Sequence, residues 1–153
     1  MVFAAAILFV LSFFHQLSFL NYEIPPLPVH HWFSWLGAIY IAGVTPAFYY
    51  LKHRYRKSYQ TFMQIHMFGN LAAFMLISVH FGHHLSEFFT IIPHPGTGLP
   101  LYIAIILMVA TGILMRFQIA TKRMRQMRFL HISMTLAFYL IIAFHILRGV
   151  QFF

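Results

Sequence analysis

The chain has 153 residues, of which 61% are apolar and 8% charged, with a formal net charge of +8 and a mean hydropathy of +0.77. A water-soluble domain of this size needs far more polar surface, so soluble globular and disordered proteins are excluded and a membrane protein is favoured. The sequence has no cysteine and only two carboxylates, Glu23 and Glu87, which excludes thiolate-held cofactors, covalently attached haem and paired-carboxylate hydrolysis.

Five apolar stretches are long enough to cross a hydrocarbon core, which needs about 20 helical residues. These predicted spans cover residues 2–20, 32–51, 62–85, 99–117 and 129–147. The first lacks the basic region and the cleavage site of a signal peptide, so we predict that it is retained. The connections are short, and they are either polar or rich in proline. Residues 1–153 are therefore predicted to form a single all-α membrane domain of five transmembrane helices.

The basic residues are unevenly distributed among the connections. Nine of the ten lysines and arginines lie in two of them, at residues 52–57 and 116–128, whereas the other two connections carry both glutamates. The positive-inside rule then predicts an integral protein of the plasma or inner membrane with its N-terminus in the cytoplasm and its C-terminus outside. The basic turns are expected to meet anionic lipid or an acidic partner, and nucleic acid is not an expected partner.

Four of the eleven histidines fall inside two of the predicted spans, His66 and His80 in the third and His131 and His145 in the fifth. Both pairs are 14 residues apart, which is about 1400° of helical rotation, so the two imidazoles share one face about 21 Å apart along the axis. The two spans are expected to run in the same direction, since one span separates them. His66 should therefore lie level with His131 on the cytoplasmic side, and His80 with His145 on the outer side.

Two imidazoles from facing helices suit the axial positions of a haem iron, and two such pairs suit two stacked b-type haems. Zinc would want four ligands, with help from thiolates or carboxylates that these positions lack. Gly69, on the shared face of the third span, is small enough to admit a flat macrocycle, although membrane helices also use small residues for close packing. A proton relay or a buried hydrogen-bonded cluster is the alternative role for these histidines.

Two arginines lie one turn from a candidate ligand, Arg128 before His131 and Arg148 after His145. We predict that they pair with haem propionates, and interfacial anchoring is an equally good explanation.

The remaining histidines give weaker signals. His15 is expected to be packed or hydrogen-bonded within the first span. Five histidines on the outer side are expected either in solvated loops or in a surface that handles metal ions or protons: His30, His31, His83, His84 and His94. His84 competes in principle with His80 as a haem ligand, but it breaks the 14-residue symmetry.

The two histidine pairs resemble those of the ferric-reductase-like transmembrane domain found in ferric reductases and NADPH oxidases, and the resemblance covers residues 32–149. It implies an inner haem b at His66 and His131 and an outer haem b at His80 and His145. Cytochrome b of the quinol-oxidising respiratory complexes is also similar, with a glycine three residues after a ligand, like Gly69, but its orientation is opposite.

NADPH-oxidising members of that family carry flavin and nucleotide domains, whereas this sequence has no dinucleotide fingerprint. Electrons are therefore expected to arrive from a quinol or from another redox subunit of a membrane complex. The leading prediction is a di-haem b subunit that carries electrons across the membrane to an acceptor by outer-sphere transfer, since bis-histidine ligation leaves no open iron site. One alternative is a self-contained reductase of metal ions or oxygen at the outer face. Another is a non-haem proton or metal transporter.

Overall fold

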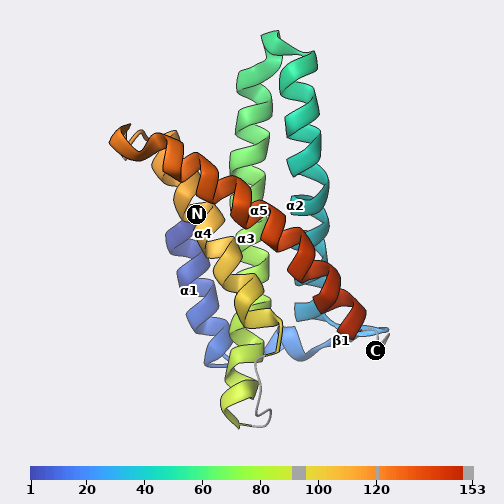
Figure 1. Cartoon of the computed structure of the whole chain (residues 1–153). Coiled ribbons are helices and arrows are strands. Elements are labelled where there is room, and N and C mark those ends of the chain that lie inside the picture. The colour runs from blue at the N-terminus through green and yellow to red at the C-terminus, as the bar shows by residue number, and fades with distance from the viewer. Residues whose placement is uncertain (91–95, 120, 150–153) are drawn as a thin grey trace. The chain divides into compact units, whose positions relative to one another are not determined.

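The computed structural model describes residues 1–90, 96–119 and 121–149, and these residues are predominantly helical (Figure 1). Their five α-helices are α1 (Val2–Phe13), α2 (Val29–Arg54), α3 (Tyr59–Thr90), α4 (Gly98–Arg116) and α5 (Met124–Gly149). Three 3-10 turns accompany them, η1 (Ser18–Asn21), η2 (Arg56–Ser58) and η3 (Thr121–Arg123). The predicted helical class is confirmed. A short hairpin of two two-residue strands, β1 (Glu23–Ile24) and β2 (Leu27–Pro28), was not predicted.

The chain divides into two compact units, Met1–Pro93 and His94–Phe153. The first unit contains α1, α2 and α3, and the second contains α4 and α5.

Three helical segments in the described ranges are long and apolar enough to cross a membrane, namely Arg56–Glu87, Gly98–Arg116 and Thr121–Arg148. This finding indicates a membrane protein, as the composition predicted. α2 has 26 residues and hence the length of a span, but its tyrosines, tryptophans and proline lower its hydropathy, and it is not among the three. The outer C-terminus stays a prediction, and so does the cytoplasmic N-terminus, which requires residues 2–20 to cross the membrane.

The predicted first span over residues 2–20 is wrong, because α1 has only 12 residues and a rise of about 18 Å, well short of a hydrocarbon core. The helix ends when His15 adopts a left-handed backbone conformation with φ of 53°. The amides of His15 and Gln16 then donate to the carbonyls of Ser12 and Leu11, which caps the helix. This ending places His15 beyond the helix.

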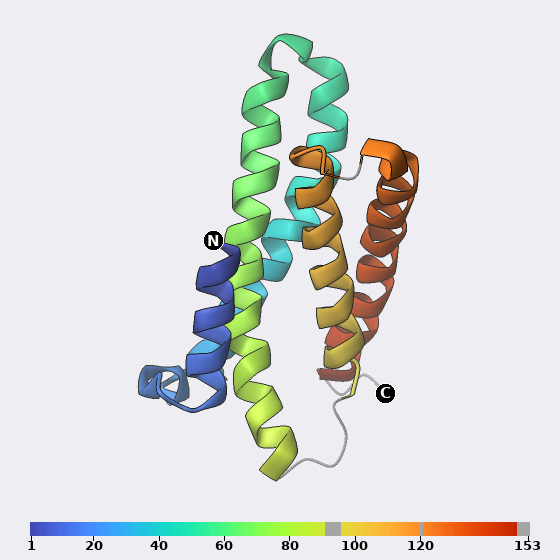
Figure 2. The same cartoon turned by 90° about the vertical axis from the view of Figure 1, so that its left-hand side faces the viewer.

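In the first unit, α1 and α2 both pack against α3, as the two views show (Figures 1 and 2). Glycines mark the closest approaches. A Cβ at Gly82 of α3 would lie 2.6 Å from the carbonyl oxygen of Phe9 in α1, and a Cβ at Gly37 of α2 would lie 2.9 Å from that of Ala73 in α3. Because α2 and α3 are joined by a short turn, the beginning of α2 lies beside the later turns of α3.

In the second unit, α4 and α5 form an antiparallel pair (Figure 2). Two threonines of this pair reach the histidines of α5. Thr111 of α4 lies beside His131, and Thr97, just before α4, lies beside His145. Both candidate ligands of α5 are therefore oriented by polar groups on or next to α4.

Candidate metal centre

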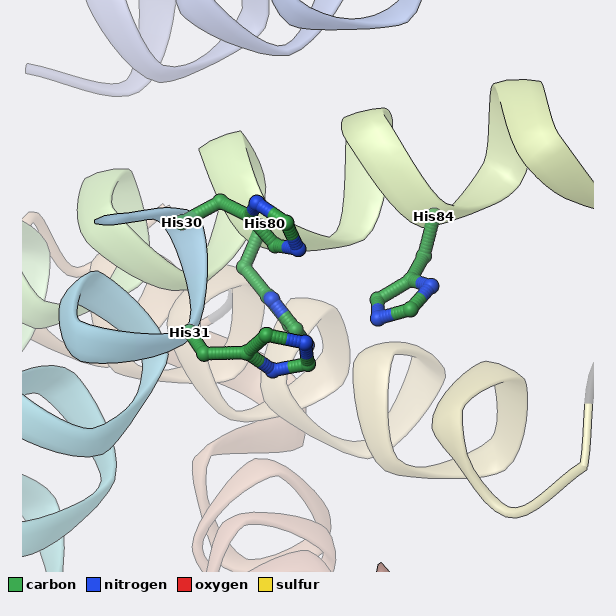
Figure 3. Close-up of side chains that lie close together, drawn as sticks. All are labelled: His30, His31, His80 and His84. Atoms are coloured by element: carbon green, nitrogen blue, oxygen red, sulfur yellow. The ribbon is translucent and has the colours of Figure 1, made fainter. Parts of the chain in front are cut away.

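Four histidines of the first unit converge where the beginning of α2 meets α3 (Figure 3). His30 and His31 are consecutive residues of α2, and His80 and His84 lie one turn apart on α3. Each offers a ring nitrogen, and these four nitrogens all lie within 4.8 Å of one another. His30 is buried and the other three are half-buried. We refer to these four residues as the four-histidine cluster.

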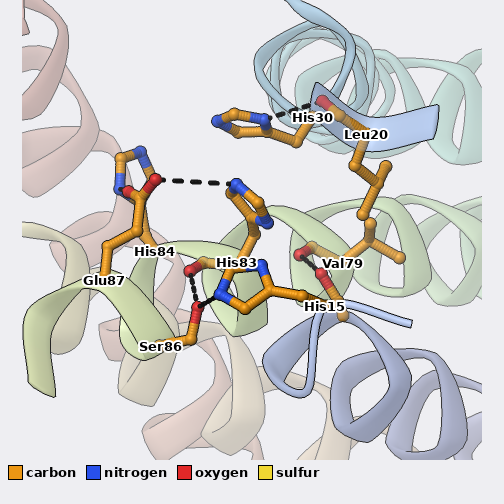
Figure 4. Close-up of polar contacts among 9 residues, drawn as sticks. His15, Leu20, His30, Val79, His83, His84, Ser86 and Glu87 are labelled. Atoms are coloured by element: carbon orange, nitrogen blue, oxygen red, sulfur yellow. Dashed lines mark hydrogen bonds and ion pairs between the residues drawn. The ribbon is translucent and has the colours of Figure 1, made fainter. Parts of the chain in front are cut away.

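Two members of the cluster have their Nδ1 atoms engaged by neighbouring oxygens (Figure 4). Nδ1 of His30 lies 3.1 Å from the main-chain carbonyl oxygen of Leu20, which can only accept a hydrogen bond. Nδ1 of His84 lies 3.1 Å from Oε2 of Glu87. With the proton on Nδ1 in both rings, Nε2 is the basic nitrogen of each ring, the atom that can bind a metal ion. Such outer partners fix the tautomer and ring orientation of metal-binding histidines.

A second layer of polar groups surrounds the cluster. Nε2 of His83 lies 3.6 Å from Oε1 of Glu87, and the ring of His83 lies 4.3 Å from that of His30. His15 reaches the same region, with Nε2 2.9 Å from the hydroxyl of Ser86 (Figure 4). The hydrogen-bonded role predicted for His15 is thus confirmed, although this residue lies outside α1.

His66, a predicted inner haem ligand, lies on α3 with its ring stacked on Phe48 at 4.6 Å between centroids. Its Nδ1 lies 3.1 Å from Nδ2 of Asn70, whose Oδ1 is buried without a hydrogen-bond partner in the described part of the chain. The two ends of an amide are nearly identical in shape, so rotating it by 180° lets Oδ1 accept from Nδ1 of His66. Nε2 of His66 is then the basic nitrogen of the ring, the atom that can bind a metal.

Gly69 makes room for a close contact between α3 and α2 that was not predicted. Its open face is covered by the ring of Tyr40, with which an added Cβ would overlap. The hydroxyl of Tyr40 donates to the carbonyl oxygen of Ile65 at 2.9 Å. Close packing of α2 on α3 is therefore sufficient to explain this glycine, and its predicted role beside a haem stays a prediction.

His131, the predicted partner of His66, has the clearest tautomer of the four predicted ligands. Its Nδ1 lies 3.0 Å from the main-chain carbonyl oxygen of Met108 and 3.0 Å from Oγ1 of Thr111. The carbonyl can only accept, and the hydroxyl of Thr111 already donates to the carbonyl of Leu107 at 2.6 Å. Nδ1 of His131 therefore carries the proton, and Nε2 keeps the lone pair that a metal requires.

The other predicted site residues of the second unit lie on α5. Nδ1 of His145 lies 2.9 Å from Oγ1 of Thr97, a hydroxyl that can donate or accept, so this contact orients the ring without assigning its tautomer. Arg128 and Arg148 are exposed on α5, which is compatible with either of the two roles predicted for them. His94 lies outside the described residues.

The outer histidines were expected either in solvated loops or in a surface that handles metal ions or protons, and His80 was not grouped with His30, His31 and His84. Two signals favoured this set: the adjacent histidines at the start of α2, and the one-turn spacing of His80 and His84, which puts both rings on one face. The 14-residue symmetry assigned His80 to a haem instead.

Comparison with protein-family models, with curated proteins and with solved structures finds no match for this chain.

Proposed function

We propose that the protein is a membrane b-type cytochrome, an electron carrier that binds haem b with His66 and His131 as axial ligands. The observation that carries the proposal is the tautomer of His131, whose Nδ1–H donates to the Met108 carbonyl and whose Nε2 keeps its lone pair. Axial histidines of b-type haems use the same arrangement. Electron transfer would be outer-sphere, since His66 and His131 would both be held by the iron and would leave it no open site.

The environment of His66, which lies in the first unit, also supports the proposal. This histidine lies on a helical segment long and apolar enough to span a membrane, where an imidazole is costly unless it serves a function. With the amide of Asn70 rotated by 180°, its Oδ1 accepts from Nδ1 of His66, as the Met108 carbonyl accepts from Nδ1 of His131. Both residues therefore fit the ligand role by the same criterion. The second haem predicted at His80 and His145 stays a prediction, because His80 is also a member of the four-histidine cluster.

A route for electrons to reach His66 begins at the basic turn between α2 and α3. Nζ of Lys52 lies 5.5 Å from the centroid of the Phe48 ring, and Phe48 stacks on His66. Arg54, Arg56 and Lys57 are exposed in the same turn. We propose that an acidic redox subunit docks on this turn or that a quinol reacts near it, and that electrons pass by way of Phe48.

The test is the spectrum of the purified chain with its candidate ligands replaced one at a time. We expect reduced-minus-oxidised bands of haem b in the wild type and their loss in both His66→Ala and His131→Ala. His53→Ala is the matched control, because this exposed histidine of α2 contacts only the ring of Tyr49 among the interactions described here. A wild-type chain without haem would favour a transporter. Reduction of an external acceptor by the isolated chain would favour the self-contained reductase.

A further inference from the structure

We propose that His30, His31, His80 and His84 bind one divalent transition-metal ion that is not part of a haem. The cluster lies entirely in the first unit, at the contact between α2 and α3. The inference does not rest on the haem at His66 and His131. His80, which its 14-residue spacing predicted to be a haem ligand, then binds a different metal.

The placement of the four rings fits one ion. A tetrahedral ion with metal–nitrogen bonds of about 2.0 Å holds its nitrogens about 3.3 Å apart. The four nitrogens of the cluster already lie within 4.8 Å of one another, so shifts on the order of 1 Å from side-chain rotation complete the site. His80 and His84 provide the one-turn pair that recurs in helical metal sites, and the consecutive His30 and His31 face them.

The residues around the cluster supply a negative charge and hydrogen-bond acceptors that orient the rings, both of which favour binding of a cation. Glu87 is one of two carboxylates in 153 residues, and its Oε2 lies 3.1 Å from Nδ1 of His84. A carboxylate behind a ligating imidazole raises the basicity of the ligand and offsets the charge of the ion. The Leu20 carbonyl plays the orienting role for His30. Histidines in a solvated loop would require neither the carboxylate nor the carbonyl to orient their rings.

His80 fits this site better than it fits a haem. Its ring centroid lies 4.9 Å from that of His31, 4.7 Å from that of His84 and 5.5 Å from that of His30. Three rings so close to His80 occupy space that a macrocycle would need around its ligand nitrogen. A haem at His80 would have to displace them, whereas a single ion uses all four.

The ligand set indicates the class of metal. Four neutral imidazole nitrogens without thiolate suit zinc, copper, nickel or iron, and they disfavour calcium and magnesium, which prefer oxygen ligands. Zinc(II) is the appropriate probe of stoichiometry because it has no redox chemistry. Copper(II) is the appropriate probe of ligand identity, since its electron paramagnetic resonance spectrum shows splitting by coordinated nitrogen.

The experiment measures zinc binding to the full chain in detergent after removal of metals with a chelator. We expect one zinc ion per chain, and copper(II) bound at the same site should show splitting from several nitrogens. His31→Ala, His80→Ala and His84→Ala should each weaken zinc binding by more than 100-fold, and Glu87→Gln by about 10- to 100-fold. His53→Ala is the control and should bind zinc like the wild type. Circular dichroism of each variant establishes that it is folded.

Haem content is measured on the same samples, which separates the two proposals. One haem with one zinc per chain, and loss of haem but not of zinc in His66→Ala, supports both. Zinc binding in a chain without haem overturns the cytochrome proposal alone. Zinc binding that is unchanged in a folded His80→Ala variant overturns the four-ligand site. Two haems per chain with no zinc bound also overturns it and restores the outer haem.

Discussion

Nδ1 of His131 lies 3.0 Å from the main-chain carbonyl oxygen of Met108, a group that can only accept a hydrogen bond. The contact joins α5 to α4 and determines which ring nitrogen carries the proton. It also places Thr111 beside the same nitrogen, where its hydroxyl accepts from Nδ1 as a second partner. The electronic properties of a metal bound at Nε2 should therefore depend on these two acceptors.

The first prediction concerns Thr111. Thr111→Val removes one acceptor from Nδ1 of His131 and leaves the Met108 carbonyl in place. The ligand becomes less basic, so the ferric state is less stabilised, and the haem midpoint potential should rise while haem content is retained. Thr135→Val is the matched control, since the Thr135 hydroxyl donates to the main-chain carbonyl of His131 and not to its ring. A redox titration that finds equal potentials for the two variants contradicts the assigned tautomer.

The second prediction concerns Asn70. If its Oδ1 accepts from Nδ1 of His66, Asn70→Asp keeps an acceptor and should retain haem, whereas Asn70→Leu should weaken haem binding by about 10- to 100-fold. Titration of haem into the unloaded variants measures both affinities. Should the Asp variant lose haem as strongly as the Leu variant, the amide donates to His66 instead, and its Nε2 is not the ligand atom.

The third prediction concerns the packing of α1 on α3. A Cβ at Gly82 would lie 2.6 Å from the Phe9 carbonyl oxygen, a main-chain atom that cannot move without moving α1. Gly82→Ala should destabilise the protein by about 1 to 3 kcal/mol, as overpacked sites do. Gly43→Ala is the control, because no described atom outside the local helix lies within 4 Å of its added Cβ. Thermal unfolding in detergent should separate the two variants, and equal melting temperatures would show that α1 does not pack as described.

The fourth prediction concerns sidedness. The chain has no cysteine, so single introduced cysteines report without background. Ser58→Cys, in the basic turn, should resist an impermeant thiol reagent in intact cells, and Tyr22→Cys should react. Both positions are exposed, and Tyr22 has 70% of its surface accessible. The opposite labelling pattern would give the chain the orientation of respiratory cytochrome b.

Helical periodicity allowed the shared face of the histidines in α3, and of those in α5, to be predicted from the sequence, because residues 14 apart lie on the same face of a continuous helix. The residue at which α1 ends could not be predicted from the sequence. The apolar run continues to Leu20 without glycine or proline, and the helix ends at a left-handed His15, a conformation for which the sequence gives no signal.

The four-histidine cluster depends on the register between two helices, which single-helix patterns do not contain. His30 lies beside His80 because the axial register of α2 on α3 is set by the turn at η2 and by the close approach of Gly37 to Ala73. Glu87 was noted in the sequence as one of two carboxylates, but its contact with His84 becomes visible only with the side chains in place.

Haem ligation by His66 and His131 is tested by a pyridine haemochrome assay on the purified wild-type chain and on its His66→Ala and His131→Ala variants. We predict haem b in the wild type and loss of the same haem in both variants, with the helical content of each variant unchanged. Absence of haem b from the wild type, or retention of that haem by either folded variant, would contradict the proposal that His66 and His131 are its axial ligands.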